Sequence, residues 1–524
     1  MIKEMPAVQV ALLCDLHLPL LENTAPYAAL QWAVDQIKER RADFCFTLGD
    51  ITAHGNPNGA ARFVREMEGM TSCENSPFCA AVMGNAELRS PGEYPQLNLI
   101  LSPLEPEAAL PLNRSGWSAC LLDSADGWLE QAQRQKLQQA LSALPSDGKM
   151  LILLHHAPEN LDEASREWLR SALSGFDRER LLLAHGHSHR LGQDSWEGFP
   201  LLSLQALDPD KAIGTPPCFT ILHLTPDGWR REEIFWPPDR DGTADILEHM
   251  GMSCFDVFGD LDEAAQKGVR LLELRQSHLK ALPEKPLREK VAAWRSAGGR
   301  YLSLHFSELG WDSDCLTGLE NWENSLYLAA LLRPDAITLH TPHASISHMK
   351  KDSPVWNRLL SLTAEGLERL PRDCAVHIEN MHMNPGDRDD GTRRFGCQPQ
   401  EVSDWMDALQ SRFSRPEQIS FLLDVGHARN NPPYNSVYTM SMWYSIMGKR
   451  MGGCHLHQVC PTEEGMKNHC VITDCYGPMI NFTSFVWSWK EGLLNRCPIF
   501  LEVRSRQNAE RSRDAWTALW RSLP

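Results

Sequence analysis

The chain has 524 residues, 42% of them hydrophobic and 23% charged, which is typical of a globular protein with two or more domains. No run of about 18 apolar residues occurs, so the sequence predicts no membrane span. The net charge of −17 argues against extended binding along a nucleic-acid backbone, but it is compatible with a small anionic substrate at a bound metal. The 15 cysteines lack paired spacing, which favours reduced thiols in a cytoplasmic protein.

The first half alternates apolar strands with helical stretches. Strands are predicted at 8–15, 43–50, 79–85, 150–156 and 181–187, with a helix near 25–41 and two or three closing strands over 199–236. Each of the first five strands runs into a polar residue, and open α/β sheets place ligands at the carboxyl ends of their strands. The Pro-, Gly- and Asp-rich stretch 236–243 is predicted to be a linker, so the first domain covers 1–238.

The second half, 245–524, has a regular rhythm of eight apolar strands separated by stretches with helical spacing. The strands are predicted at 252–258, 269–275, 301–307, 336–342, 375–381, 419–428, 452–459 and 498–504. Eight strands with intervening helices over about 280 residues have the size and order of a (β/α)8 TIM barrel. The predicted fold class is therefore an α/β sandwich followed by a TIM barrel.

The polar strand ends of the first domain form five short motifs. Asp, His and Asn side chains with a bridging carboxylate are the ligands that hold two divalent ions about 3.5–4 Å apart. In the stretch LAHGHSHRLG, alternate histidines point to the same side of an extended segment. The motifs are Asp15-Leu16-His17, Gly49-Asp50, Gly84-Asn85, His156-Ala157-Pro158 and Gly186-His187-Ser188-His189.

In this order the motifs resemble the calcineurin-like metallophosphoesterase superfamily, whose pattern runs D-x-H, G-D, G-N-H-[DE], H-x-P and G-H-x-H. The resemblance implies two Mn, Fe or Zn ions and hydrolysis of a phosphoester, with a diester as the expected substrate. It assigns one ion to Asp15, His17, Asp50 and His189, and the other to Asp50, Asn85, His156 and His187. Asp50, which bridges the ions, and Asn85 are the expected catalytic residues, and Arg190 is an expected substrate contact.

One position departs from the family pattern. Ala86 stands where the family has a histidine that contacts the substrate phosphate or protonates the leaving group. Losing a general acid typically costs about 10²–10⁴-fold in rate. We therefore expect a diester or a substrate with a good leaving group, the alternative being a domain that has become structural. His54, His155 and Arg89 are lesser candidates for substrate contact, and His185 is expected to be no ligand.

Polar residues also end the predicted barrel strands, where barrel enzymes place their chemistry. A core strand gains nothing from a carboxylate, so these residues indicate a site. Glu379, Asp424, His455 and Glu502 can encircle one divalent ion with nitrogen and oxygen ligands. The full set of strand-end residues is His305, His340, Glu379, Asp424 with His427, His455 and Glu502.

The segments IENM (378–381) and LDVGHA (423–428), with Glu502, resemble the xylose isomerase-like TIM-barrel superfamily. That superfamily includes sugar epimerases and isomerases and the endonuclease IV type of nuclease (AP endonuclease family 2). An epimerase implies one Mn-like ion at Glu379, Asp424, His455 and Glu502, with Glu379 and Glu502 exchanging a proton with a sugar.

A nuclease implies up to three zinc ions, with His305, His340, His427 and His469 as additional ligands. Lys467 replaces an acidic ligand of that pattern and is expected to oppose a third metal or to meet a substrate anion. The remaining barrel histidines are expected to pack or to face solvent, and Cys454 and Cys460 to be buried thiols. These histidines are His343, His348, His377, His382 and His457.

The sequence thus favours a bifunctional metalloenzyme. It predicts a two-metal phosphoesterase joined to a metal-dependent barrel, with one to three Mn or Zn ions, acting on a small phosphorylated or sugar-like substrate. In the main alternative both domains hydrolyse phosphoesters of nucleotides or nucleic acid. A third interpretation, supported by Ala86, is a metal-binding regulatory protein without catalysis.

Overall fold

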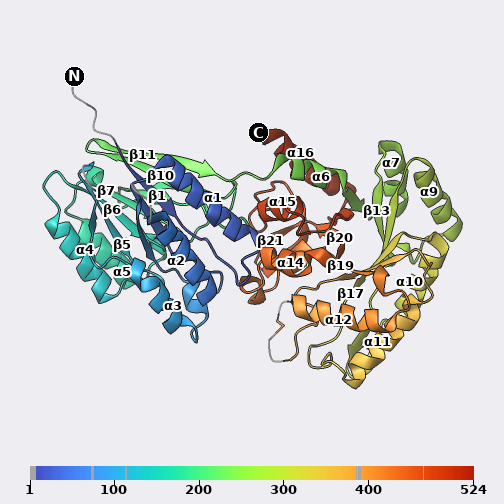
Figure 1. Ribbon diagram of the computed structural model, residues 1–524. Helices are drawn as coiled ribbons and strands as arrows, with labels where there is room; N and C mark the ends of the chain where they lie inside the picture. Colours follow the sequence, from blue (N-terminus) through green and yellow to red (C-terminus); the bar gives the residue numbers. More distant parts are fainter. Residues whose placement is uncertain (1–6, 72–75, 113–114, 385, 388–390, 464) are drawn as a thin grey trace. The chain divides into compact units, whose positions relative to one another are not determined.

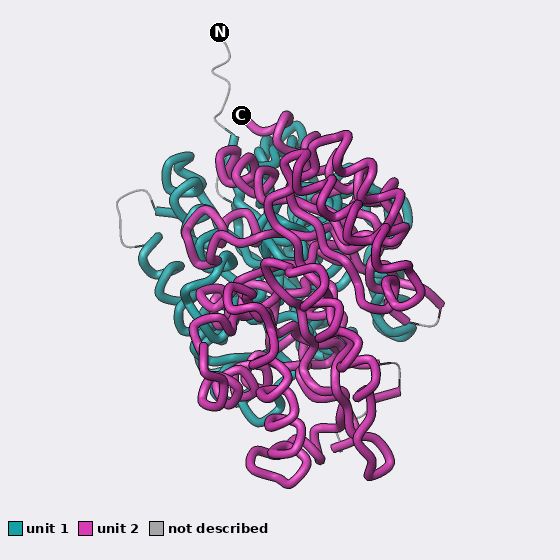
Figure 2. The backbone as a smooth tube through the Cα atoms, turned by 90° about the vertical axis from the view of Figure 1, so that its right-hand side faces the viewer, with its two compact units in different colours: residues 1–237, 481–484 teal, residues 238–480, 485–524 magenta. Residues whose placement is uncertain are grey.

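The computed structural model describes residues 7–71, 76–112, 115–384, 386–387, 391–463 and 465–524. The chain divides into two compact units, shown in separate colours in Figure 2. Unit 1 consists of residues 1–237 and 481–484, and unit 2 of residues 238–480 and 485–524. The linker predicted at 236–243 is shorter than expected, because a helix, α6 (Arg240–Glu248), already begins within it. The Asp239 carboxylate accepts a hydrogen bond from the Gly242 N–H at 2.6 Å and so caps this helix.

Unit 1 contains two sheets. The first has the order β11-β10-β1-β2-β3, with β1, β2 and β3 parallel (Figure 1). The second has the order β4-β5-β6-β7-β9-β8, with antiparallel strands at both edges. The strands of unit 1 are β1 Val8–Leu13, β2 Phe44–Leu48, β3 Phe78–Val82, β4 Leu110–Pro111, β5 Trp117–Leu122, β6 Lys149–Leu154, β7 Leu181–His185, β8 Gly192–Trp196, β9 Phe199–Ser203, β10 Cys218–Thr225 and β11 Gly228–Phe235.

The two sheets pack face to face. Alternate strand residues point to opposite sides of a sheet, so one strand contributes side chains to two cores. In β1, Val10 and Leu12 join the core between the sheets, and Ala11 and Leu13 pack under helices on the outer face. The second sheet is covered by helices on its other side in the same way. The helices are α1 Ala25–Arg40, α2 Pro57–Thr71 and α3 Tyr94–Leu101 on the first sheet, and α4 Gln131–Ala143 and α5 Glu163–Leu173 on the second.

Unit 2 is a closed barrel of eight parallel strands, which confirms the predicted barrel. Closure brings the carboxyl ends of all eight strands around one axis. The strands are β12 Met250–Ser253, β13 Leu271–Arg275, β14 Tyr301–His305, β17 Ala336–His340, β18 Ala375–Glu379, β19 Ile419–Asp424, β20 Met451–Leu456 and β23 Ile499–Leu501.

Helices and two hairpins complete unit 2 (Figure 1). The hairpins, β15 Gly310–Asp312 with β16 Cys315–Thr317 and β21 Gln458–Thr462 with β22 Gly465–Cys470, follow strands β14 and β20. Among the described residues no helix combines the length and hydropathy needed to cross a membrane. Besides α6, the helices are α7 Val257–Lys267, α8 Gln276–Leu279, α9 Glu284–Ser296, α10 Leu319–Leu332, α11 Pro354–Leu367, α12 Pro399–Arg412, α13 Val425–Arg429, α14 Met440–Met447, α15 Thr483–Lys490 and α16 Arg506–Ser522.

Candidate metal centres

Polar side chains gather in unit 1 where strands of both sheets end. They follow β1, β2 and β3 of the first sheet and β6 and β7 of the second. We call this group the unit 1 cluster: Asp15, His17, Asp50, Asn85, His155, His156, His187 and His189. It contains every metal ligand that the sequence resemblance assigned to the first domain, together with His155.

Four residues of the unit 1 cluster form a compact group, Asp15, His17, Asp50 and His189. His17 Nε2 lies 3.2 Å from His189 Nε2, 3.6 Å from Asp50 Oδ2 and 4.0 Å from Asp15 Oδ1. His189 Nε2 lies 3.4 Å from Asp15 Oδ1. One ligand atom from each residue thus faces the same small space, as a shared divalent ion requires.

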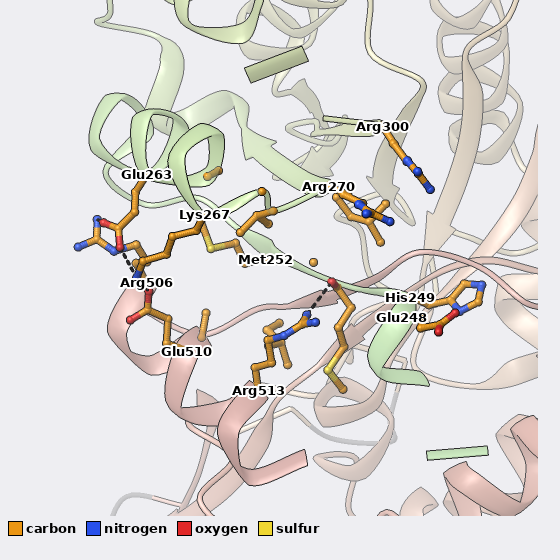
Figure 3. Close-up of a pocket in the computed structure, with 18 residues that line it drawn as sticks. Glu248, His249, Met252, Glu263, Lys267, Arg270, Arg300, Arg506, Glu510 and Arg513 are labelled. Carbon is orange, nitrogen blue, oxygen red and sulfur yellow. Dashed lines mark hydrogen bonds and ion pairs between the residues drawn. The ribbon is translucent and has the colours of Figure 1, made fainter. Parts of the chain in front are cut away.

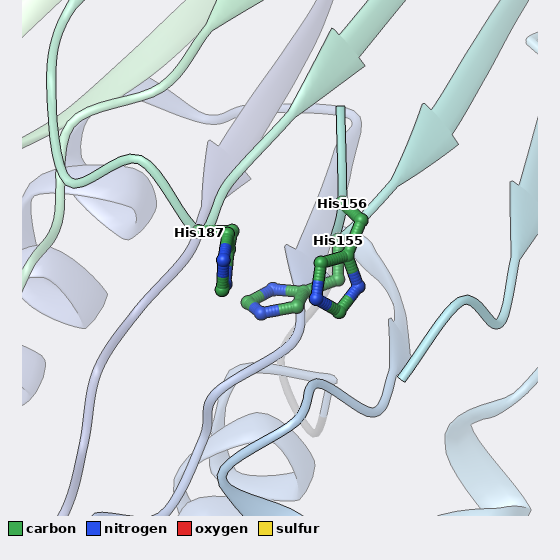
Figure 4. A group of neighbouring side chains, drawn as sticks. All are labelled: His155, His156 and His187. Atoms are coloured by element: carbon green, nitrogen blue, oxygen red, sulfur yellow. The ribbon is translucent and has the colours of Figure 1, made fainter. Parts of the chain in front are cut away.

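A second group lies on the other side of Asp50. His155 Nε2 is 3.3 Å from Asp50 Oδ1 and 3.0 Å from Asn85 Oδ1. The rings of His155, His156 and His187 face one another, with centroids 4.4 Å apart for His156 and His187 (Figure 4). Asp50 contacts both groups through its two oxygens, which is the position of a bridging ligand.

Much of the unit 1 cluster sits on backbone in the left-handed region. Asp15, His17, Asp50, His187 and His189 have φ between 44° and 65°, a conformation uncommon outside glycine. Such strain costs about 1–3 kcal/mol per residue and concentrates at functional sites. The backbone is also crowded, since a Cβ on Gly84 would lie 2.4 Å from Asp50 Oδ1.

Burial keeps most of the imidazoles in the form that binds metal. It lowers the pKa of His17 and His187, and that of His156 to about 4. Burial by itself raises the pKa of Asp15, but the charge and hydrogen bond of His189 hold it below its ordinary value. His155 differs, because Asp50 and Asp15 raise its pKa despite burial. Neutral imidazoles beside charged carboxylates are the protonation states that metal ligands need.

Four residues next to the unit 1 ligands in the sequence have their own positions in the structure. Ala86 is fully buried and its N–H donates to Asp50 Oδ1 at 2.7 Å, so its side chain contributes no proton donor. Glu87 accepts hydrogen bonds from Thr52 and Gly84, and burial raises its pKa to about 7. His185 is buried, with Nδ1 at 2.8 Å from its neighbour's carbonyl oxygen, and Arg190 is exposed.

The barrel carries a second group at the carboxyl ends of its strands. His305, His340, Glu379 and Asp424 are the last residues of β14, β17, β18 and β19, and Glu502 directly follows β23. All ligand candidates that the sequence placed in the barrel converge here. We call this group the barrel cluster: His305, His340, Glu379, Asp424, His427, His455, His457, His469 and Glu502.

Glu379 is the centre of the barrel cluster. Its Oε2 lies 3.1 Å from His305 Nε2 and 3.3 Å from His340 Nε2. Its Oε1 lies 3.2 Å from His427 Nδ1 and 3.5 Å from His455 Nδ1. One carboxylate therefore faces imidazoles on both oxygens, which is the arrangement of a ligand shared between ions.

A second part of the barrel cluster surrounds Asp424 and Glu502. His457 Nε2 lies 3.0 Å from Asp424 Oδ1, and His469 Nδ1 lies 3.4 Å from Glu502 Oε2. His455 Nδ1 lies 3.1 Å from Glu502 Oε2 and 3.7 Å from Asp424 Oδ2. His457, which was expected to pack or to face solvent, is fully buried, and its Nε2 lies against Asp424, so it belongs to the barrel cluster.

Two acidic residues outside the barrel cluster orient its imidazoles. Glu273 on β13 is fully buried and lies 3.0 Å from His455 Nε2, and Glu308 lies 3.2 Å from His340 Nδ1. Carboxylates on the second ring nitrogen are typical outer partners of metal-binding histidines. Sequence reasoning missed both residues; for Glu273, a carboxylate inside an apolar strand was the available signal.

The charges of the barrel cluster are strongly coupled. Burial by itself raises the pKa of Glu379, but His340 and His455 lower it well below its ordinary value. Burial by itself lowers the pKa of His340, but Glu379 and Glu308 raise it to about 9. Arg275 forms an ion pair with Glu502. This excess of buried carboxylate demands nearby positive charge, which protons on imidazoles or divalent ions provide.

Several buried polar atoms in the two clusters make no hydrogen bond within the described part of the chain. A buried polar atom without a partner costs about 1–3 kcal/mol, so a native site that gathers several of them fits an ion that would satisfy them. The donor sets of both clusters therefore fit divalent metals. These atoms are His17 Nδ1 in unit 1, and His340 Nδ1, Glu379 Oε1, His455 Nδ1, His469 Nδ1 and both Glu502 oxygens in the barrel.

A cleft of about 1200 Å³ opens beside the barrel cluster. His469 lines it together with Lys467 and Arg504, both of which are exposed. His382 and Asp387 lie on its wall. The predicted substrate contact Lys467 thus lies where an anion could approach the barrel cluster.

Comparison with solved structures finds likenesses over about half of the chain. Endonuclease IV from Thermus thermophilus is 16% identical at a TM-score of 0.36, covering 52% of this chain and 100% of its own. A xylose isomerase domain protein from Planctomyces limnophilus is 14% identical at a TM-score of 0.35, covering 52% and 95%. A D-psicose 3-epimerase solved in the presence of D-fructose is 11% identical at a TM-score of 0.33, covering 52% and 97%. These low values assign no activity to the chain. No protein-family model and no curated protein matches it.

Proposed function

We propose that the chain is a metal-dependent phosphoester hydrolase with two separate centres, one in each unit. The observation that carries the barrel part is the Glu379 carboxylate, which lies within 3.5 Å of His305, His340, His427 and His455. A single ion takes about four such ligands, and the barrel cluster offers nine residues. The surplus favours two or three ions, and its richness in imidazole favours zinc.

The residues that would hold ions in unit 1 are those of the unit 1 cluster, with Asp50 shared. Paired divalent ions supply Lewis-acid activation of water and neutralise phosphoryl charge. The chain itself supplies a rigid cradle, since Asp50 is held by the Ala86 N–H and faces both histidine groups. Ala86 leaves the leaving group without a protonating side chain at this position, which supports a diester or a good leaving group as substrate.

In the barrel, Lys467 and Arg504 at the cleft would bind the anionic substrate and orient it toward the barrel cluster. Glu273 and Glu308 would hold the His455 and His340 rings in place. Small phosphorylated molecules fit the cleft and the acidic chain better than a long nucleic acid, because the net charge of −17 repels an extended phosphate backbone.

A sugar isomerase or epimerase remains the second candidate for the barrel. One observation favours it: the four ligands that this activity needs, His455 and three carboxylates, lie together. His455 Nδ1 lies 3.1 Å from Glu502, 3.5 Å from Glu379 and 3.7 Å from Asp424. With a single ion, Glu379 and Glu502 would flank the sugar as the acid/base pair.

The test combines a count of bound metal ions with assays of two classes of substrate. Protein purified without added metal would be analysed for ions per chain and assayed with bis(p-nitrophenyl) phosphate and with a panel of ketoses. We expect two or three ions in the barrel, lost in Glu379→Gln, and diester hydrolysis. One barrel ion with ketose epimerisation would replace the hydrolase assignment of the barrel by the second candidate. Bound metal without turnover of either class would support a regulatory protein instead.

A further inference from the structure

A cavity of about 750 Å³ lies in unit 2 at the amino ends of the strands, the opposite end from the barrel cluster (Figure 3). Met250 opens β12, and Arg270 and Arg300 immediately precede β13 and β14. Helices α7 and α16 form its other walls. No residue of the barrel cluster lines this cavity, so it is a separate feature of the barrel.

Small residues create the space. Ala264 on α7 and Ala509 on α16 face it, and both are buried. Gly251 on β12 cannot carry a side chain, because its Cβ would lie 2.2 Å from the Leu271 carbonyl oxygen. The two helices are bridged across the gap by ion pairs, Arg506 with Glu263 at 2.7 Å and Lys267 with Glu510 at 2.6 Å.

The cavity has an excess of positive charge in a chain of net charge −17. Five cationic side chains and three carboxylates line it, and Glu263 and Glu510 are already paired. Within the described part of the chain, Arg270, Arg300 and Arg513 form no ion pair. Five cations in one concave wall, three of them without an ion-pair partner, form a positive surface that an anion would stabilise.

Arg270 and Arg300 line the cavity with exposed side chains, and hydrogen bonds to the backbone hold the side chain of Arg513. The backbone N–H of Arg300 donates to the backbone carbonyl oxygen of Arg270 at 2.8 Å, so these two residues are neighbours. The Arg513 guanidinium donates to the carbonyl oxygens of Met250 at 3.1 Å and Leu247 at 3.4 Å. Met252, Leu271 and Leu501 give the cavity an apolar stretch of wall, and Glu248 and His249 also line it.

We propose that this cavity is a binding site for a phosphorylated small molecule of nucleotide size. Arg270 and Arg300 would hold the phosphate, since guanidinium groups match phosphate oxygens in bidentate geometry. The apolar part of the ligand would pack against Met252, Leu271 and Leu501. Small-molecule sites typically enclose about 300–1,000 Å³ and combine apolar walls with a few polar groups. Because this site lies away from the barrel cluster, the inference is independent of the reaction that the barrel performs.

Isothermal titration calorimetry on the full chain tests the site with AMP, adenosine and inorganic phosphate as probes. We expect AMP to bind more tightly than either fragment. In the Arg270→Gln/Arg300→Gln variant AMP affinity falls roughly tenfold or more, because hydrogen bonds to charged groups are lost. Arg511→Gln is the matched control: Arg511 is an exposed arginine of α16 that does not line the cavity, and its substitution leaves AMP affinity unchanged.

Three results would overturn the proposal. The first is the absence of saturable AMP binding to the wild-type chain. The second is AMP affinity that is equal in the wild type and the double variant, since binding would then occur elsewhere, for example at the metal clusters. The third is inorganic phosphate binding as tightly as AMP, which would remove the role of the apolar wall. Circular dichroism of both variants establishes that each is folded.

Discussion

The two clusters use similar ligands but position them differently. In unit 1, Asp15, His17, Asp50, His187 and His189 lie two or four residues beyond their strands, on left-handed backbone. In the barrel, His305, His340, Glu379 and Asp424 are themselves the last residues of strands. Of the barrel cluster only His469, which lies on a hairpin, has positive φ, at 58°.

The difference follows from topology. A closed barrel points all its strand ends at one axis, so a ligand needs only to be the last residue of a strand. Two packed sheets present their strand ends in two separate rows, and the chain must bend sharply after each strand to bring ligands together. The unit 1 cluster therefore stores backbone strain at five residues, and the barrel cluster at His469 alone.

The two clusters also differ in the groups that contact the second ring nitrogen of their imidazoles. In unit 1, backbone carbonyl oxygens of Leu48 and Ser124 lie 2.9 Å and 2.6 Å from the Nδ1 atoms of His155 and His156. In the barrel, backbone carbonyl oxygens also lie beside Nδ1 of His305, His427 and His457, but the carboxylates of Glu273 and Glu308 hold His455 and His340. Side-chain substitution can therefore remove an outer partner in the barrel but not these partners in unit 1.

The largest expected effect tests whether the clusters are independent. Asp50→Asn should release the ions of unit 1 and leave the barrel loaded, and Glu379→Gln should do the reverse. The loss of affinity should exceed the about 10–100-fold that removal of an outer partner costs. Metal content per chain by mass spectrometry measures it, with the exposed α11 residue Glu365 changed to Gln as control. Loss of all ions in either variant would mean a single shared site.

Glycine substitution tests the role of left-handed backbone in unit 1. Gly49 has φ of 77°, and a Cβ there would lie 2.6 Å from His155 Nδ1. Gly49→Ala should lower the free energy of unfolding of unit 1 by about 2–5 kcal/mol, from strain and overpacking together. Gly116→Ala isolates the strain, since Gly116 has φ of 74° with no neighbour within 4 Å, and should cost about 1–2 kcal/mol. If urea unfolding gave the same loss of unfolding free energy for Gly49→Ala and Gly116→Ala, the crowding argument would be contradicted.

Removal of an outer carboxylate tests the barrel side of the comparison. Glu308→Gln should weaken metal binding at the barrel cluster by about 10–100-fold, because His340 loses the charge that orients it. Competition with a chromophoric chelator measures the affinity, and the unit 1 ions should be unaffected. An unchanged barrel affinity would show that Glu308 serves Arg394, its ion-pair partner at 2.8 Å, instead of the metal centre.

The last test is a pH dependence of stability confined to unit 1. Burial raises the pKa of Asp123 from 3.8 to about 6. The folded state then holds this proton more tightly than the unfolded state, so the carboxyl lowers stability as pH rises from about 4 to 6. Asp123→Asn should stabilise unit 1 above pH 6 by roughly 2–3 kcal/mol and have no effect near pH 3. Thermal unfolding at several pH values measures this, and a pH-independent gain would exclude the carboxyl as its cause.

The sequence predicted the eight strands of the barrel, because most of them are buried apolar runs between helical stretches. The first was displaced: a strand was predicted at 252–258, whereas β12 is Met250–Ser253 and α7 begins at Val257. The strand-end positions of His305, His340, Glu379 and Asp424 followed from the same pattern. In unit 1 the strand β5 was not predicted, since the run WSACLL is as compatible with a buried helix as with a strand.

The missed site residues depend on contacts distant in sequence. Glu273 reads as an isolated charge in a core strand, and only barrel closure brings it to His455, 182 residues later. His457 lies two residues after His455 and reads as a packing residue until the turn after β20 directs it to Asp424. Such pairings require tertiary structure, which periodicity does not encode.

An ion bound at the central Glu379 carboxylate would link metal supply to the lifetime of the protein. Imidazoles from three other strands and from α13 meet at this carboxylate, so an ion bound there would tie together segments that separate on unfolding. Binding to the folded chain alone adds about 2.7 kcal/mol of stability when the free ion exceeds its Kd a hundredfold. Chains that lack the ion populate open forms more often and are exposed to proteases. Metal starvation should therefore reduce the cellular amount of this protein as well as its activity.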